Sequence, residues 1–137
     1  MGNSFVHVEL STGDLKSATN FYKKLFDWKL QSMDMGGHQY TMIDAGKNKV
    51  GGGMQKTTMP AAPPMWLSYV EVDDVKKTIA KAKKLGANVV LEYQAIGEMG
   101  AIGVFVDPTG AALGVWQQGA PAKKAPQKAA AKKAKKK

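Results

Sequence analysis

The sequence contains no cysteine, which excludes disulfides, thiolate zinc sites and cysteine nucleophiles. Any metal ion would have to be held by histidine, aspartate or glutamate, and only two histidines are present. No apolar run approaches the roughly 18 residues that a membrane-spanning helix needs, and the N-terminus lacks the basic and apolar pattern of a signal peptide. These absences predict a cytoplasmic protein without membrane contact.

Acidic residues are missing from the lysine-rich C-terminal tract, residues 120–137, which contains eight lysines. The rest of the chain contains the other twelve lysines and all eleven acidic residues, so its charges nearly cancel. The net charge of +9 therefore comes mainly from this tract. Its Ala/Lys/Pro composition offers no bulky side chain to bury, which predicts a disordered tail. Such a tail could attach to nucleic acid or another polyanion through phosphates, without reading bases, or it could serve only solubility.

The rest of the chain, residues 1–119, has room for one globular domain. Within it, one pattern occurs twice, over about residues 3–58 and 64–118. Matching residues lie 60 positions apart in the two copies, as in the pairs Asp14 and Asp74, and Leu25 and Leu85. A proline-containing stretch between the copies, with Pro60, Pro63 and Pro64, is typical of a linker.

Hydrophobic periodicity predicts a strand, a helix and three strands in each copy, hence an α+β fold of two βαβββ units. In the first copy the strands are expected at 5–10, 28–33, 39–44 and 50–55, and the helix from about Asp14, with an apolar stripe of Leu15, Ala18, Phe21 or Tyr22, and Leu25. In the second copy the strands are expected at 66–72, 88–93, 102–106 and 113–117. A helix is expected to be capped by Asp73 or Asp74 and to end at Gly86. Its apolar stripe consists of Val75, Ile79, Ala82 and Leu85.

Four motifs, in this order, resemble the vicinal oxygen chelate superfamily, which includes glyoxalases, bleomycin-resistance proteins and extradiol dioxygenases. They are residues 7–14, 20–28 (NFYKKLFDW), 70–74 (VEVDD) and 107–110 (DPTG). The last motif is also a turn on physical grounds, because Pro fixes one dihedral and Gly can take a positive φ. The resemblance implies that the paired units form a cup-shaped mixed sheet around a small ligand.

In metal-using members of that superfamily, the first and last strands of each half supply the ligands. The corresponding positions here are His7, Leu67, Gly114 and, near the middle of a glycine run, Gly52. Leucine and glycine side chains cannot donate to a metal, so we expect no metal and no other cofactor. A shifted ligand set that includes Glu9 and Glu71 stays open as the alternative.

The first strand alternates, so Phe5, His7 and Glu9 are expected on one face and Val6, Val8 and Leu10 on the other, against the helix. The expected ligand-binding set is His7, Glu9, Met54, Gln55, Leu67, Tyr69 and Trp116. His7 and Glu9 are also the candidates for acid–base catalysis. A purely structural role stays open for His7, as does core filling for Met54 and Trp116.

Together these patterns predict metal-independent binding of a small, partly apolar or aromatic molecule, and leave open whether a reaction follows. The alternative is a divalent-metal lyase or isomerase of the glyoxalase type. A homodimer is expected, because one chain with two such units leaves sheet edges and an open groove.

Overall fold

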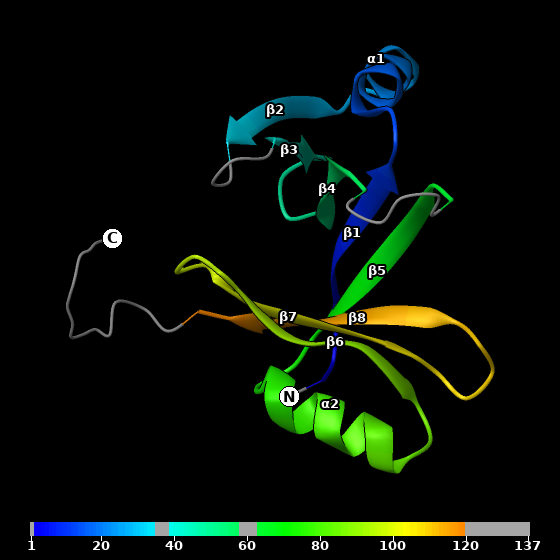
Figure 1. Cartoon of the computed structure of the whole chain (residues 1–137). Helices are drawn as coiled ribbons and strands as arrows, with labels where there is room; N and C mark the ends of the chain where they lie inside the picture. Colours follow the sequence, from blue (N-terminus) through cyan, green and yellow to red (C-terminus); the bar gives the residue numbers. More distant parts are fainter. Residues whose placement is uncertain (1, 35–38, 58–62, 120–137) are drawn as a thin grey trace. The chain divides into compact units, whose positions relative to one another are not determined.

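The protein is described by a computed structural model over residues 2–34, 39–57 and 63–119 (Figure 1). These residues form eight strands and two helices in the order β1–α1–β2–β3–β4 and then β5–α2–β6–β7–β8. The two βαβββ runs and the α+β class predicted from the sequence are therefore confirmed. His38, Pro60 and the tail at 120–137 lie outside the described residues.

Contacts divide the described chain into two units, which we call the N-terminal unit (residues 5–69) and the C-terminal unit (residues 2–4 and 70–119). Strand β5 (Met65–Glu71) begins in the first and ends in the second. Each unit is described by itself below.

In the N-terminal unit, hydrogen-bonded strands follow the order β2-β3-β4-β1-β5. The bounds are Phe5–Thr12 for β1, Lys29–Asp34 for β2, Gln39–Asp44 for β3 and Gly51–Lys56 for β4. β1 and β4 are parallel, whereas β3 is antiparallel to both β2 and β4. The predicted mixed pairing is thus confirmed, and the register places Glu9 opposite Gly53 and Leu10 opposite Met54.

Helix α1 (Leu15–Leu25) begins where Asp14 accepts a hydrogen bond from the Ser17 backbone N–H at 3.0 Å. It covers a core of Leu10, Ile43 and Met54, against which Leu15, Ala18 and Tyr22 pack. Of the two alternatives for the stripe, Tyr22 faces the core and Phe21 faces solvent. The expectation for Leu25 is wrong: it is 55% exposed, because the helix ends there and the chain turns away at Phe26.

In the C-terminal unit, helix α2 (Val75–Lys84) is capped by Asp74, which accepts from the Lys77 N–H at 3.0 Å. Val75 and Ile79 are buried with Val72 and Val115. Leu85, predicted to continue this stripe, is 69% exposed, because it lies at the C-cap where the helix ends. Gly86 then takes the positive φ of +106° that terminates the helix as predicted.

Three antiparallel strands complete this unit in the order β8-β7-β6, with bounds Asn88–Ile96 for β6, Gly100–Val106 for β7 and Ala112–Gln118 for β8. The predicted turn between β7 and β8 is confirmed. Asp107 accepts hydrogen bonds from the Thr109 N–H at 2.8 Å and from the Ala111 N–H at 3.1 Å, and Gly110 has a φ of +102°.

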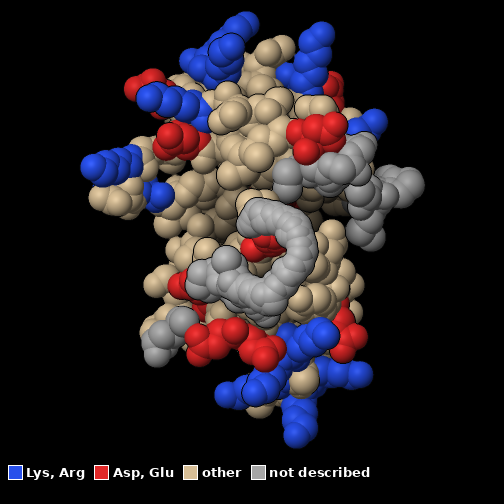
Figure 2. Space-filling view, turned by 90° about the vertical axis from the view of Figure 1, so that its left-hand side faces the viewer, with Lys and Arg blue, Asp and Glu red and all other residues tan. Residues whose placement is uncertain are grey.

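No helix in the described part of the chain is long and apolar enough to cross a membrane. Lysine and acidic side chains both reach the surface on the face that Figure 2 shows. This mixture agrees with the near-balance of charge before the lysine-rich tract.

Candidate functional site

Five side chains of the N-terminal unit form one hydrogen-bonded group, which we call the polar cluster: His7, Glu9, Tyr40, Gln55 and Tyr69. Glu9 is its centre. The Tyr40 hydroxyl donates to Glu9 Oε2 at 2.8 Å, while the Tyr69 hydroxyl and the Gln55 Nε2 donate to Oε1 at 3.1 and 3.2 Å. The carboxylate of Glu9 is therefore held by three donors from three different strands.

His7 joins the polar cluster through Tyr40, whose hydroxyl lies 2.8 Å from His7 Nε2. The Tyr40 hydroxyl has one proton and gives it to Glu9, so its oxygen can only accept from His7. The neutral imidazole must then carry its proton on Nε2. Its Nδ1 keeps a lone pair and has no hydrogen-bond partner among the described residues.

Tyr40 reaches Glu9 because the strand between them carries a glycine. β4 lies between β3 and β1, and a Cβ atom at Gly53 would collide with the Tyr40 phenol ring. The bare backbone at Gly53 thus lets the ring cross over β4 toward β1. This accounts structurally for one residue of the glycine run.

Burial keeps His7 and the two tyrosines of the polar cluster uncharged at neutral pH. The pKa of His7 is lowered from 6.5, mainly by desolvation, and the negative charge of Glu9 opposes this shift. Desolvation and, secondly, the charge of Glu9 raise the pKa of Tyr40 and of Tyr69 well above the usual value for tyrosine. At neutral pH the phenols are donors, and His7 is an uncharged base.

The structure brings together four of the residues predicted for the site: His7, Glu9, Gln55 and Tyr69. Tyr40 was missed, because nothing in the sequence states that β3 lies two strands from β1. Leu67 is partly buried on β5, two residues before Tyr69. Trp116 belongs to the C-terminal unit, where its ring covers Gly100.

The expected position of Met54 is wrong. Met54 is fully buried with Leu10 and Ile43, on the helix side of β4, whereas its neighbour Gln55 lies on the face of Glu9. The parallel register causes this, since directly paired residues share a face and Met54 pairs with Leu10. Met54 therefore fills the core.

A divalent metal ion does not fit the donors of the polar cluster. Both oxygens of Glu9 already accept hydrogen bonds, His7 Nε2 is bonded to Tyr40, and Leu67, Gly52 and Gly114 have no donor atoms. No group of three or more His, Asp or Glu side chains suited to a metal occurs among the described residues.

A model of the glyoxalase/bleomycin resistance protein/dioxygenase superfamily matches residues 4–115. The chain belongs to this superfamily. The resemblance seen in the sequence is thereby confirmed, and the match spans both βαβββ runs.

Two relatives of this chain are longer proteins. A provisionally named glyoxylase of Mycobacterium tuberculosis is 34% identical over 114 residues, covering 80% of this chain and 44% of the relative. An anthracycline biosynthesis protein of Streptomyces peucetius is 27% identical over 128 residues, covering 81% of this chain and 46% of the relative. The chain thus spans less than half the length of either relative.

Solved structures show the same superfamily fold. A hypothetical protein from Bacillus halodurans matches with a TM-score of 0.67 at 12% identity, covering 90% of this chain and 100% of that one. Methylmalonyl-CoA epimerase from Mycobacterium tuberculosis matches with a TM-score of 0.63 at 14% identity, covering 85% and 88%. At these identities the likeness establishes the fold alone.

Proposed function

We propose that this protein binds a small organic molecule at the polar cluster, without a metal ion, and that His7 Nδ1 accepts a hydrogen bond or a proton from it. The observation that carries the proposal is the hydrogen-bond chain from Glu9 through Tyr40 to His7. It fixes the tautomer of His7 and leaves one basic nitrogen with no partner among the described residues.

The chemistry of the polar cluster suggests which chemical group of the ligand contacts His7. An uncharged imidazole nitrogen accepts from a weakly acidic O–H or N–H group, such as a phenol or an enol. An apolar side chain is also near, since Leu67 lies on the same strand face as Tyr69 by alternation. A relative named for anthracycline biosynthesis supports an aromatic ligand of this kind. Trp116 stays a residue that the sequence alone predicts for ligand binding.

Whether a reaction follows binding depends on the ligand. A proton taken up at Nδ1 would create an imidazolium that the charge of Glu9 favours, as its effect on the pKa of His7 indicates. General-base catalysis needs such a base within hydrogen-bond reach of the substrate proton. In the polar cluster the base is His7, and Tyr40 and Glu9 hold its tautomer.

The alternative function is a metal-dependent lyase or isomerase of the glyoxalase type. The provisional name of the mycobacterial relative favours it. The hydrogen bonds that already occupy Glu9 and His7 Nε2 speak against it.

Thermal unfolding with a panel of phenols and β-diketones tests the proposal, with His7→Phe as the variant and Phe5→Ala as the matched control. Phe5 is an exposed residue of the same strand. Compounds that bind should raise the melting temperature of the wild type by several degrees at about 100 times Kd. His7→Phe should weaken binding about fivefold or more, because one hydrogen bond is lost. Phe5→Ala should respond like the wild type.

Equal stabilisation of His7→Phe and wild type would contradict the proposed role of His7. Elemental analysis of protein purified without added metal decides between the two functions. Stoichiometric nickel, zinc, iron or manganese that is lost in His7→Phe would establish the metal-dependent alternative instead.

A further inference from the structure

A cavity lies in the N-terminal unit, on the opposite side of β1 from the polar cluster. Its volume is about 350 Å³, within the range of small-molecule pockets. Val8 lines it, and because side chains alternate along a strand, Val8 points away from the face of His7 and Glu9. We call this cavity the aromatic pocket.

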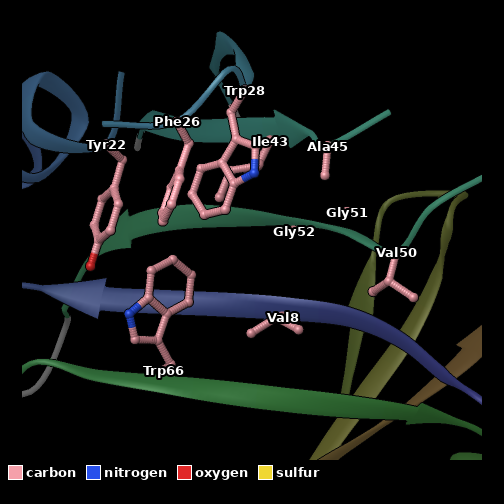
Figure 3. A pocket seen from close by; sticks show the side chains of 10 residues that line it. All are labelled: Val8, Tyr22, Phe26, Trp28, Ile43, Ala45, Val50, Gly51, Gly52 and Trp66. Atoms are coloured by element: carbon pink, nitrogen blue, oxygen red, sulfur yellow. The ribbon is translucent and has the colours of Figure 1, made fainter. Parts of the chain in front are cut away.

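One end of the aromatic pocket is surrounded by four aromatic side chains, and Val50 lies at the other end (Figure 3). The four are Tyr22, Phe26, Trp28 and Trp66. The rings of Trp28 and Trp66 are 6.4 Å apart and inclined by 72°, and Tyr22 meets Trp66 edge-on at 5.5 Å. Phe26 lies 4.8 Å from Trp28. The aromatic rings thus present both faces and edges to the space beside them.

The floor of the aromatic pocket is bare backbone. A Cβ atom at Gly52 would collide with the backbone of Val8, and one at Gly51 would lie 2.7 Å from the carbonyl oxygen of Ile43. Any side chain at these two positions would therefore have to displace a neighbouring strand. Close approach of the neighbouring strands therefore accounts for both glycines, and it leaves this part of the pocket wall without side chains.

Core packing accounts for only part of the pocket wall, since Tyr22 and Trp28 pack against the adjacent core. Trp66, Phe26 and Val50 are 38%, 45% and 48% exposed, whereas Met54 in the adjacent core is fully buried. The indole N–H groups of Trp28 and Trp66 also have no hydrogen-bond partner within the described ranges. Large apolar surface left open around a concave space is unfavourable in water unless something binds there.

We infer that the aromatic pocket is a second binding site, which takes a planar, fused-ring aromatic molecule bearing a carbonyl oxygen. A flat ring system can lie over the glycine floor while it stacks against the indoles. The carbonyl oxygen can accept from an indole N–H. This inference is independent of the proposed function, because it uses none of the residues of the polar cluster.

The test is calorimetric titration of the full chain at high salt with anthraquinone-2-sulfonate, a planar tricyclic ketone. Camphor-10-sulfonate is the comparison, since it is also a ketone and a monoanion, to which the lysine-rich tract is equally attracted, but it is not planar. We expect the planar compound to bind at least about tenfold more tightly. Trp66→Ala should weaken its binding about tenfold or more, whereas Phe5→Ala should leave it unchanged.

A second variant allows the inference to be tested even if Trp66→Ala fails to fold. Ala45 is exposed and lines the aromatic pocket, so Ala45→Phe should fill the space and block binding without removing a core side chain. Equal binding of the two sulfonates, or unchanged binding in Ala45→Phe, would overturn the inference. So would loss of anthraquinone binding in Glu9→Gln, which would move the compound to the polar cluster. Loss of self-association in Trp66→Ala, measured by sedimentation, would overturn it in favour of a contact with a second copy.

Discussion

Glu9 determines how the residues of the polar cluster are arranged. Tyr40, Tyr69 and Gln55 each approach it as donors, and the two phenols remain protonated because burial and the charge of Glu9 both oppose their ionisation. His7 is then linked to the carboxylate through Tyr40, with a tautomer that follows from the number of available protons. One carboxylate thus fixes the tautomer of a base to which it is linked through Tyr40.

Removing the charge of Glu9 should lower the pKa of His7 further. Burial lowers this pKa from 6.5 and Glu9 opposes the shift, so Glu9→Gln leaves burial unopposed. The measurement is an NMR titration of the imidazole carbon and nitrogen resonances. Asp44→Asn removes a carboxylate of the same unit outside the polar cluster and should have a smaller effect. An increase in the His7 pKa in Glu9→Gln would contradict this account.

The lowered pKa of His7 makes the stability of the folded protein depend on pH. The pKa of His7 is lower in the folded than in the unfolded protein, so as the pH falls below 6.5 the unfolded chain binds the proton first. The contribution of His7 to stability is therefore complete above pH 6.5 and declines as the pH falls through its folded pKa. Glu9→Gln should extend this decline to lower pH.

Alternation along β1 was enough to predict that His7 and Glu9 share a face, and the superfamily resemblance, through Leu67, added Tyr69. Tyr40 could not be predicted in the same way, because its role depends on strand order and on the missing side chain of Gly53. Met54 was assigned to the wrong face, because alternation within a strand does not give the register between strands. Local pattern thus identifies which residues share a face of one strand, and pairing decides which strands meet.

At the level of secondary-structure elements, both helices begin in the same way. Asp14 and Asp74 each accept a hydrogen bond from the backbone N–H three residues later, at 3.0 Å in both cases. The sequence predicted these starts, because a capping side chain acts over a few residues. It did not predict that Leu25 and Leu85 would be exposed, since burial at the end of a helix depends on how far the packed sheet extends.

Replacing the cap of α2 should reduce stability, whereas replacing its neighbour should not. Asp74→Ala removes the acceptor of the Lys77 N–H and should cost about 1 kcal/mol in the free energy of unfolding. Asp73→Ala removes an exposed carboxylate next to it and should change stability by less than about 0.5 kcal/mol. Urea unfolding followed by circular dichroism measures both. Equal losses would show that charge near the helix start, and not the cap, is responsible.

At the scale of the whole molecule, the superfamily domain and the lysine-rich tract differ in net charge. Residues before the tract carry nearly equal numbers of lysines and acids, while the tract carries eight lysines and no acid. Neither the polar cluster nor the aromatic pocket uses a lysine. The proposed ligand binding and the predicted polyanion attachment can therefore be tested separately, and the homodimer stays a prediction.

The tract should hold the protein on DNA in a way that depends on salt but not on sequence. Each lysine that neutralises a phosphate releases a counterion, so affinity should fall steeply between low and moderate salt. Retention of the full chain on two unrelated duplexes, compared with a variant in which all eight tail lysines are replaced by glutamine, measures this. The variant keeps the length of the chain and both predicted ligand sites, so its ligand binding should be unchanged while its retention is lost. Equal retention of the two proteins at low salt would assign DNA binding to the domain or rule out the attachment, and the tract would then be left with a role in solubility.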